Sequence, residues 1–599
     1  MDRMAAGEFT VALVEGGPCS GKGAVMKVLE AYAREKGASV LHGVCRGWEI
    51  PEPYQAITMA VNQALMARGE TRTFPDCMFQ MPSAESERID VSRAGSGIRM
   101  TQEAIWKFMK ETVGEKPLLL SINNFQWASP ATCLFLDFLF GLPEKGRLML
   151  VLAYRPEELD DPQNPALRML DRIQANFQVH RLVLGHLYLA EIAPLMRYGL
   201  GFDPPDELLR YVAKESGGVP AHILWLVRHL ARTGVIDGRT GRWAGEPPGP
   251  KAPPAPSLKE ILRSAVSALT PDAADLLKAI AISGWAATGT ILEEVLERSP
   301  GELEPLGKEL VDAGFISIDG EPGSLVFGFR EGLTRECIYD NIKGEERRRL
   351  HWRTGNAIEK YLLGQPEGSL FVLAHHFSLS GDIGKAIQYT TMAGDLAIEM
   401  QAYEEALAHY EFALTTLEWE EESAEKKAGE LRLLSRLGAA CLALRSPERS
   451  LEFHARVLRL AEEVRDAPRR AESLVKLGEA YLEMGEWAMA LKDLKRGLAA
   501  ALEAGDARTT LLARLGLAGA YCRREVYHKG IEYMEKVTRQ QLTDSELKRK
   551  AAIVWLDIGA HVLEGSRKFI ESAQALFRTL GDTESLAQCE VELSKLNIH

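Results

Sequence analysis

Apolar and polar positions along the first 160 residues alternate as expected for strands and helices that follow one another. Residues 23–37 have apolar side chains at helical spacing, and Gly37 can cap that helix. Four short apolar runs are strand candidates: 9–15, 38–45, 116–124 and 147–155. The third run is strongly apolar, as in central parallel strands that helices cover on both faces. Strands that alternate with helices predict a parallel α/β sheet.

The rest of the chain changes pattern three times. Residues 160–240 read as helices, and residues 245–257 then carry six prolines in thirteen positions, which predicts a linker. Helical patterns followed by an alternating, glycine-punctuated stretch predict a winged helix. The predicted domains are an α/β core (1–160), a helical lid (161–244), a proline-rich linker (245–256), a winged-helix domain (257–345) and an all-α solenoid (346–599).

The solenoid is predicted from a repeat. Three segments align in steps of 40 residues, at Leu437-Gly438, Leu477-Gly478 and Leu517-Ala518. In each segment a small residue follows, where a second helix must pass close to the first: Ser450, Ala490 and Gly530. This pattern is typical of tetratricopeptide repeats, here with a longer period than usual. Stacked helix pairs form a concave surface that commonly binds a protein or peptide.

Composition narrows the function classes. The 599 residues carry a net charge of −13 and eight scattered cysteines without a CxxC pair, which predicts a cytoplasmic protein with reduced thiols and no zinc site. The sequence contains no apolar run of about 18 residues, so we expect no membrane span. Residues 257–345 contain 8 Lys+Arg against 16 Asp+Glu, so DNA binding there is disfavoured. His375 and His376 are adjacent rather than i, i+4, so no metal pair is expected.

A glycine-rich segment, Gly16-x4-Gly21-Lys22, stands between the first strand and the first helix. Glycines let backbone N–H groups wrap a phosphate, the helix dipole points there, and Lys22 adds a cation. The candidate nucleotide-binding residues in this segment are Gly16, Gly17, Pro18, Cys19, Ser20, Gly21, Lys22 and Gly23. Cys19 lies at a helix N-terminus, which can lower the pKa of a thiol.

The groups that would hold a metal ion are missing from this pattern. P-loop NTPases bind Mg²⁺ through a Ser or Thr after the Lys, and through an acidic residue after an apolar strand. Here Gly23 takes the first position, and Asn123 and Asn124 take the second. An Asn carbonyl carries no charge and cannot act as a general base. We therefore expect no catalytic residue, no metal ligand and no efficient hydrolysis, although phosphate binding does not require these groups.

The order of these motifs resembles the STAND class of signalling ATPases. It is most similar to the AAA-type modules of large LuxR-type regulators and of repeat-fused bacterial Ser/Thr kinases and cyclases. "VEGGPCSGKG" resembles the family's Walker A motif and "LLLSINNFQWAS" its Walker B region. "LVLAYRPEEL" resembles its sensor strand, which places Arg155 where a γ-phosphate-sensing Arg would lie. "SGGVPAHILWLVRHL" resembles its lid motif, in which Pro220 would pack near the base.

The resemblance implies an α/β P-loop NTPase core with helical lid and winged helix, followed by an all-α tetratricopeptide solenoid. It also has departures. Glu331 replaces a frequent His, and only eight residues precede the first strand, where the family usually has a Gly-Arg-Glu box. We expect either a mis-assigned start or an incomplete base pocket. The kinase, cyclase or helix-turn-helix effector of such regulators is also missing, so we expect the output to be supplied in trans.

The resulting hypothesis is a degenerate STAND-type signalling regulator or scaffold. It would bind ATP or ADP independently of Mg²⁺ or with weak dependence on it, and a protein partner through residues 346–599. A kinase or a transcription factor is the expected class of partner, with no membrane involved. The alternatives are a slow but competent ATPase switch, a pure protein-interaction scaffold without nucleotide, and a transcriptional regulator.

Overall fold

The computed structural model describes residues 8–47, 49–66, 96–142, 147–200, 203–245, 255–284, 286–320, 325–361, 370–538, 542, 544–562, 565–580 and 582–596. These residues form two compact units. The first contains the described residues up to 66 and from 108 to 386, and the second those of 96–107 and 387–596. No helix in the described ranges combines the length and the apolar character that crossing a membrane requires.

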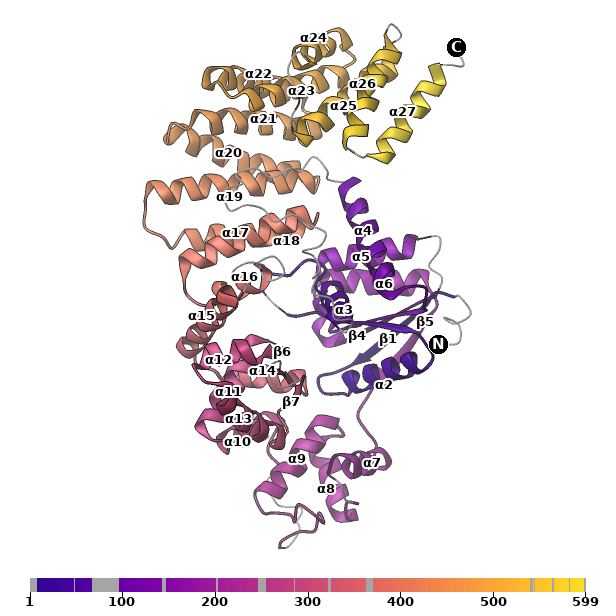
Figure 1. Cartoon of the computed structure of the whole chain (residues 1–599), viewed down its shortest axis with the longest axis vertical. Coiled ribbons are helices and arrows are strands. Elements are labelled where there is room, and N and C mark those ends of the chain that lie inside the picture. Colours follow the sequence, from indigo (N-terminus) through magenta and orange to yellow (C-terminus); the bar gives the residue numbers. More distant parts are fainter. Residues whose placement is uncertain are drawn as a thin grey trace. The chain divides into compact units, whose positions relative to one another are not determined.

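The first unit begins with a five-stranded parallel sheet in the order β2-β3-β4-β1-β5. Its strands are β1 (Thr10–Gly16), β2 (Ser39–Val44), β3 (Leu118–Asn123), β4 (Leu148–Tyr154) and β5 (Val179–Leu184). The helices of this region are α2 (Lys22–Glu35), α3 (Gln55–Met66), α4 (Ser96–Val113), η1 (Phe125–Trp127), α5 (Pro130–Gly141), η2 (Pro156–Glu158) and α6 (Pro165–Asn176). Helix α2 covers one face of the sheet, and α5 and α6 cover the other (Figure 1). The predicted parallel α/β sheet is therefore present.

Strand β5 differs from the sequence-based expectation. Residues 160–240 read as helices, but Val179–Leu184 pairs with β1 from Val11↔Val179 to Gly16↔Leu184. β5 is an edge strand, and its four middle residues are exposed. Its only apolar run is the short Leu182–Leu184, and this run follows the polar His180 and Arg181, so its sequence lacks both the alternation and the length that indicate a strand. The prediction of a purely helical segment from residue 161 is wrong at this strand.

Three helices follow: α7 (Leu189–Leu200), α8 (Asp206–Ser216) and α9 (Pro220–Arg232). They fall within the residues (161–244) that the sequence predicted to be helical, and their role as a lid stays a prediction. Pro220 at the first position suits a helix start, because an N–H group at this position would have no intrahelical acceptor and proline has none to satisfy. Most of the predicted proline-rich linker, residues 246–254, lies outside the described residues.

The winged-helix segment (residues 257–345) combines helices with a three-stranded antiparallel sheet in the order β6-β8-β7. Its elements are α10 (Leu258–Ser267), α11 (Pro271–Ser283), β6 (Ala286–Thr288), α12 (Gly289–Leu296), α13 (Pro300–Asp312), β7 (Ile316–Asp319), β8 (Val326–Phe329) and α14 (Gly332–Asn341). The expected hairpin is β7–β8, and β6 is an additional strand. One continuous core joins this segment to α9, with Trp225 and Phe315 at 5.0 Å between ring centroids.

The boundary between the two units does not coincide with the predicted start of the solenoid at residue 346. Helices α15 (Gly344–Tyr361) and α16 (Leu370–Ser378) belong to the first unit. The reason is packing, because α15 lies against α11 and α12 of the winged-helix segment and α16 lies against α15. His351 of α15 and His376 of α16 are fully buried there, with their Nδ1 atoms 3.0 Å apart.

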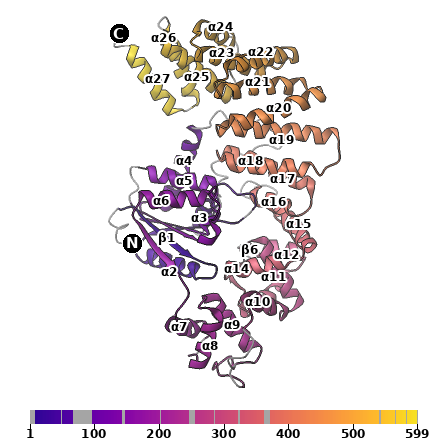
Figure 2. The ribbon, with the colours of Figure 1, turned by 180° about the vertical axis from the view of Figure 1, so that it is seen from behind.

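The second unit is an array of helices in which neighbours in sequence pack together (Figure 2). Its helices are α17 (Ile383–Glu399, which begins in the first unit), α18 (Tyr403–Leu417), α19 (Ala424–Ala443), α20 (Pro447–Glu463), α21 (Ala467–Glu483), α22 (Trp487–Ala504), α23 (Ala507–Arg523), α24 (Tyr527–Thr538), α25 (Ser545–His561), α26 (Ser566–Leu580) and α27 (Thr583–Leu596).

The small residues predicted at the helix crossings are where the pattern places them. Ser450 is fully buried, and its hydroxyl donates to the Gly438 carbonyl at 2.8 Å. A Cβ at Gly478 would lie 2.5 Å from Leu494 Cγ, so only glycine allows α21 and α22 to approach this closely. Charged groups also join helices that are not neighbours in sequence, since Lys476 of α21 lies 3.4 Å from Glu546 of α25.

Candidate functional site

The predicted phosphate loop (residues 16–22) connects the end of β1 to the start of α2. Cys19 and Gly21 have φ values of 60° and 94°, so two left-handed residues alternate with Ser20. Such alternation turns successive N–H groups toward one side, as in anion-binding nests. A Cβ at Gly16 would meet Ser20 Oγ at 2.5 Å and Leu184 O at 3.0 Å, so this tight loop requires glycine there.

Lys22 is directed into its own loop. Its Nζ donates to Gly17 O at 2.7 Å and to Gly16 O at a shorter distance. Burial lowers the pKa of Lys22 to about 8, and repulsion from Arg155 adds to this. A phosphate that bound here would have to draw Nζ away from these two carbonyl groups.

Asn123 and Asn124 lie at the carboxyl end of β3. Because all five strands are parallel, this end is on the same edge of the sheet as the phosphate loop, and ligands of open α/β sheets bind along that edge. The carbonyl of Asn123 accepts from Cys45 N at 2.9 Å, and Asn124 has a φ of 54° as it starts η1. Among the described residues there is no cluster of three or more His, Cys, Asp or Glu side chains that could hold a metal ion.

Arg155 follows β4 and is the most extensively bound cation of the site. Its Nη1 donates to Glu158 at 2.6 Å, and its Nη2 donates to Glu336 of α14 at 3.0 Å. The guanidinium also lies 5.4 Å from the Trp127 ring. Burial would lower the pKa of Arg155, but the two carboxylates outweigh it and raise the pKa. The predicted sensor Arg is thus engaged by the protein's own acids.

Sequence reasoning missed three residues of this arrangement: Gln126, Glu158 and Glu336. Gln126 Oε1 accepts from the Arg155 backbone N–H, and its Nε2 donates to Glu158, both at 3.2 Å. Glu158 could have been found from its i+3 spacing to Arg155. Glu336 is 181 positions from Arg155 in the chain, so its contact depends on tertiary structure.

The thiol of Cys19 does not behave as its position at a helix N-terminus suggests. Burial raises its pKa to about 12, and the nearby carboxyl groups of Glu331 and Glu336 contribute in the same direction. Burial therefore outweighs the effect of the helix N-terminus, which favours the interpretation of Cys19 as an ordinary loop residue over a redox-active thiol. The same interaction shows that Glu331, at the position of the family's frequent His, is an electrostatic neighbour of the phosphate loop.

The carboxyl group of Glu331 is buried, and its neighbours compensate only in part for the loss of water. Burial raises the pKa of its carboxyl, against attraction from Arg228 and hydrogen bonds from Trp225 and Thr334. Its Oε2 is buried without a hydrogen-bond partner in the described structure. Pro220 begins α9, the helix that carries Trp225 and Arg228, and its predicted contact with a base stays a prediction.

The fold defines a class: a parallel α/β sheet with a glycine-rich loop between its first strand and the next helix, followed in the chain by a helical repeat array. The family model described as tetratricopeptide repeat matches residues 429–503, so this stretch of the second unit consists of tetratricopeptide repeats. These residues lie in α19 to α22.

An uncharacterized protein of Rhizobium meliloti (strain 1021) is 24% identical over 470 residues, which are 73% of this chain. The match covers 43% of the relative, so the chain spans less than half of its length. The STAND protein with a tetratricopeptide repeat sensor from Pyrococcus horikoshii is similar at 14% identity and a TM-score of 0.35, over 98% of this chain and 93% of that one.

The Rap conjugation gene regulator of the plasmid pLS20, solved with the Phr* peptide, is similar at 12% identity and a TM-score of 0.33, over 54% of this chain and 79% of that one. At TM-scores below 0.5, neither likeness defines the fold or function of this chain.

Proposed function

We propose that this chain is a degenerate STAND-type regulator. It binds the phosphates of ATP or ADP at the phosphate loop without hydrolysing them efficiently, and it binds a protein partner through its repeats. One observation supports this most directly. The loop offers alternating left-handed residues and Lys22, whereas Gly23, Asn123 and Asn124 stand where a Mg²⁺ site needs a hydroxyl and carboxylates.

The contacts of Arg155 suggest how such a regulator would respond to nucleotide. Glu336 of the winged-helix segment holds the guanidinium that would otherwise contact a phosphate. Phosphate and Glu336 would therefore compete for Arg155. Nucleotide binding would weaken the connection between the sheet and α14, which gives the loop a means of changing the rest of the first unit.

Isothermal titration calorimetry of the full chain with ATP and ADP, each with Mg²⁺ or with EDTA, tests the nucleotide half. We expect binding that EDTA does not abolish and that Lys22→Ala weakens at least tenfold. Lys27→Ala is a matched control, because Lys27 is an exposed residue of the same helix. ATP turnover that Lys22→Ala removes would refute the non-hydrolysing assignment.

A nucleotide-free scaffold is the second candidate, and one observation favours it. Both cations of the site, Lys22 and Arg155, already have protein acceptors. If neither nucleotide binds while the chain is folded, this candidate replaces the first. Binding of a protein partner is tested separately, by cross-linking mass spectrometry of the tagged full chain. The cross-links to a captured protein should lie in α19–α24.

A further inference from the structure

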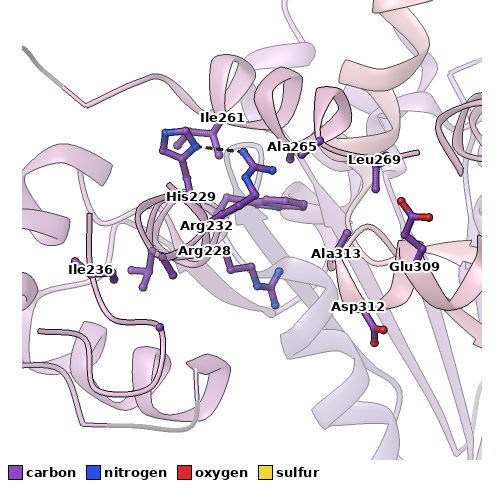
Figure 3. A pocket seen from close by; sticks show the side chains of 15 residues that line it. Arg228, His229, Arg232, Ile236, Ile261, Ala265, Leu269, Glu309, Asp312 and Ala313 are labelled. Carbon is purple, nitrogen blue, oxygen red and sulfur yellow. Dashed lines mark hydrogen bonds between the residues drawn. The ribbon is translucent and has the colours of Figure 1, made fainter. Parts of the chain in front are cut away.

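A cavity of about 420 Å³ lies between α9, α10 and α13 and is not part of the phosphate-loop site. Its apolar lining includes Ile236, Ile261 and Leu269 (Figure 3). Helix α9 contributes Arg228 from one side, and α13 contributes Glu309 and Asp312 from another. Pockets of a few hundred Å³ with apolar walls and a few polar groups are typical of small-molecule sites.

Arg228 is fixed in place without a hydrogen-bonding acceptor. Its guanidinium lies 5.6 Å from the Trp225 ring on one side. On the other side it fills the space at Gly314, where a Cβ would lie 2.5 Å from its Nη1. Within the part of the chain that the structure describes, no carboxylate or carbonyl accepts from this guanidinium. Burial lowers the pKa of Arg228, and nearby Arg330 adds to that effect, whereas attraction from the carboxyl group of Glu331 opposes it.

The other charged groups of the cavity differ in what they already bind. Arg232 donates to Ser264 at 2.9 Å, and both oxygens of Glu309 accept from Thr270 at 2.8 Å. Asp312 is exposed toward solvent and has no ion pair or hydrogen bond with a side chain among the described residues. Arg228 and Asp312 line the same cavity, and no ion pair joins them in the described structure.

We propose that this cavity binds a small zwitterion, namely an amino acid or dipeptide with an apolar side chain. Arg228 binds the carboxylate through its fork of N–H donors, Asp312 binds the ammonium group, and the wall formed by Ile236, Ile261 and Leu269 covers the side chain. A ligand with both charges would supply a hydrogen-bonding acceptor to Arg228 and a cation to Asp312, which form no ion pair with each other in the described structure. This inference is independent of nucleotide and partner binding.

The size of the cavity favours a ligand with a bulky apolar side chain over glycine or alanine. A bound zwitterion would also connect α9 to α13, which belong to the lid and to the winged-helix segment. The ligand would therefore stabilise the junction between these two parts of the first unit.

Calorimetry on the full chain tests the proposal with defined probes: L-leucine, L-phenylalanine and the dipeptide Leu-Leu. N-acetyl-L-leucine lacks the ammonium group, and L-leucinamide lacks the carboxylate. Each charge-assisted contact should be worth about tenfold or more in affinity, so both blocked analogues should bind at least about tenfold more weakly than L-leucine. The dipeptide arm distinguishes the two ligand sizes.

Variants assign each charge to its residue. With Arg228→Gln, L-leucine should bind no better than L-leucinamide, because the carboxylate has lost its partner. With Asp312→Asn, L-leucine should bind no better than N-acetyl-L-leucine. Arg210→Gln, on the exposed face of α8, is the control and should bind L-leucine like the unmodified chain.

Two results would overturn the proposal without depending on a folded variant. The first is the absence of binding by L-leucine, L-phenylalanine and Leu-Leu to the unmodified, folded chain. The second is equal affinity for L-leucine and both blocked analogues, which would mean that neither charge is recognised.

Discussion

The contact between Arg155 and Glu336 can be tested by removing one charge. Glu336→Gln keeps the shape of the side chain and a neutral acceptor, but it deletes the carboxylate that lies 3.0 Å from Arg155 Nη2. Arg155 retains Glu158 at 2.6 Å. We expect α14 to lose part of its attachment to the end of β4 while the sheet stays folded.

The size of this loss follows from geometry and burial. Hydrogen bonds to charged groups contribute about 1.5–3 kcal/mol, and exposed ion pairs about 0.2–1 kcal/mol. The side chain of Arg155 is 8% exposed and that of Glu336 is 29% exposed, so this pair lies between the two classes. Removing the charge should therefore cost about 1–2 kcal/mol, which is a factor of about 5–30 in the equilibrium for local opening.

Hydrogen–deuterium exchange on the full chain measures that opening. Amides of residues 332–341 should exchange about 5–30 times faster in Glu336→Gln, and adding Arg155→Met should change them little further, because the pair is already broken. Glu304→Gln, an exposed Glu of α13, serves as the control. Unchanged protection of α14 in Glu336→Gln would show that the contact does not hold this helix, and the competition argument would fail with it.

Three further outcomes are expected. Gly478→Ala should destabilise the repeats by about 1–3 kcal/mol through the clash with Leu494, as seen by circular dichroism melting, whereas Gly429→Ala, with 3.4 Å to its nearest side chain, should be neutral or stabilising. Cys19 should resist iodoacetamide at pH 8, because its pKa is raised to about 12; labelling as fast as that of a free thiol would contradict this. Nucleotide affinity, where present, should fall above about pH 8, since Lys22 loses its proton there and phosphate binding must restore it; affinity that is constant from pH 7 to 9 would exclude Lys22 as the phosphate ligand.

The elements that sequence predicted are those whose pattern reflects their own burial. β3 is strongly apolar, with Ser121 as an interruption, because helices cover both faces of the sheet, and its position was predicted to within a few residues. β5 was not predicted because four of its six residues are exposed, so its apolar and polar positions do not alternate as in a half-buried strand. The solenoid boundary failed for another reason: α15 is helical like the repeats, and only its packing against α11 and α12 assigns it to the first unit.

The candidate site shows a similar division. The loop and its missing metal ligands can be read from Gly16 to Gly23 and from the two Asn residues, because these groups are local. The hydrogen-bond partners of the charged groups in the site cannot be read from the sequence in this way. That Lys22 turns into its loop, and that Arg155 is held by Glu336, depends on which distant groups reach them. Cys19 is the clearest case, since the helix dipole favours a thiolate but burial and two distant carboxyl groups outweigh it.

Two acids of the α14 region, Glu331 at its N-cap and Glu336 within the helix, act on the candidate site in the same direction. Glu331 raises the pKa of Cys19 in the phosphate loop, and Glu336 neutralises Arg155. Both therefore place negative charge where a nucleotide would bring its phosphates. Since like charges in a low-dielectric site repel strongly, the phosphate binding proposed above and the present position of α14 would oppose each other. The free energy of nucleotide binding would then be reduced by the free energy needed to displace α14. A ligand or partner that binds only while α14 is in place would weaken nucleotide binding, and nucleotide would weaken the binding of that ligand or partner by the same factor.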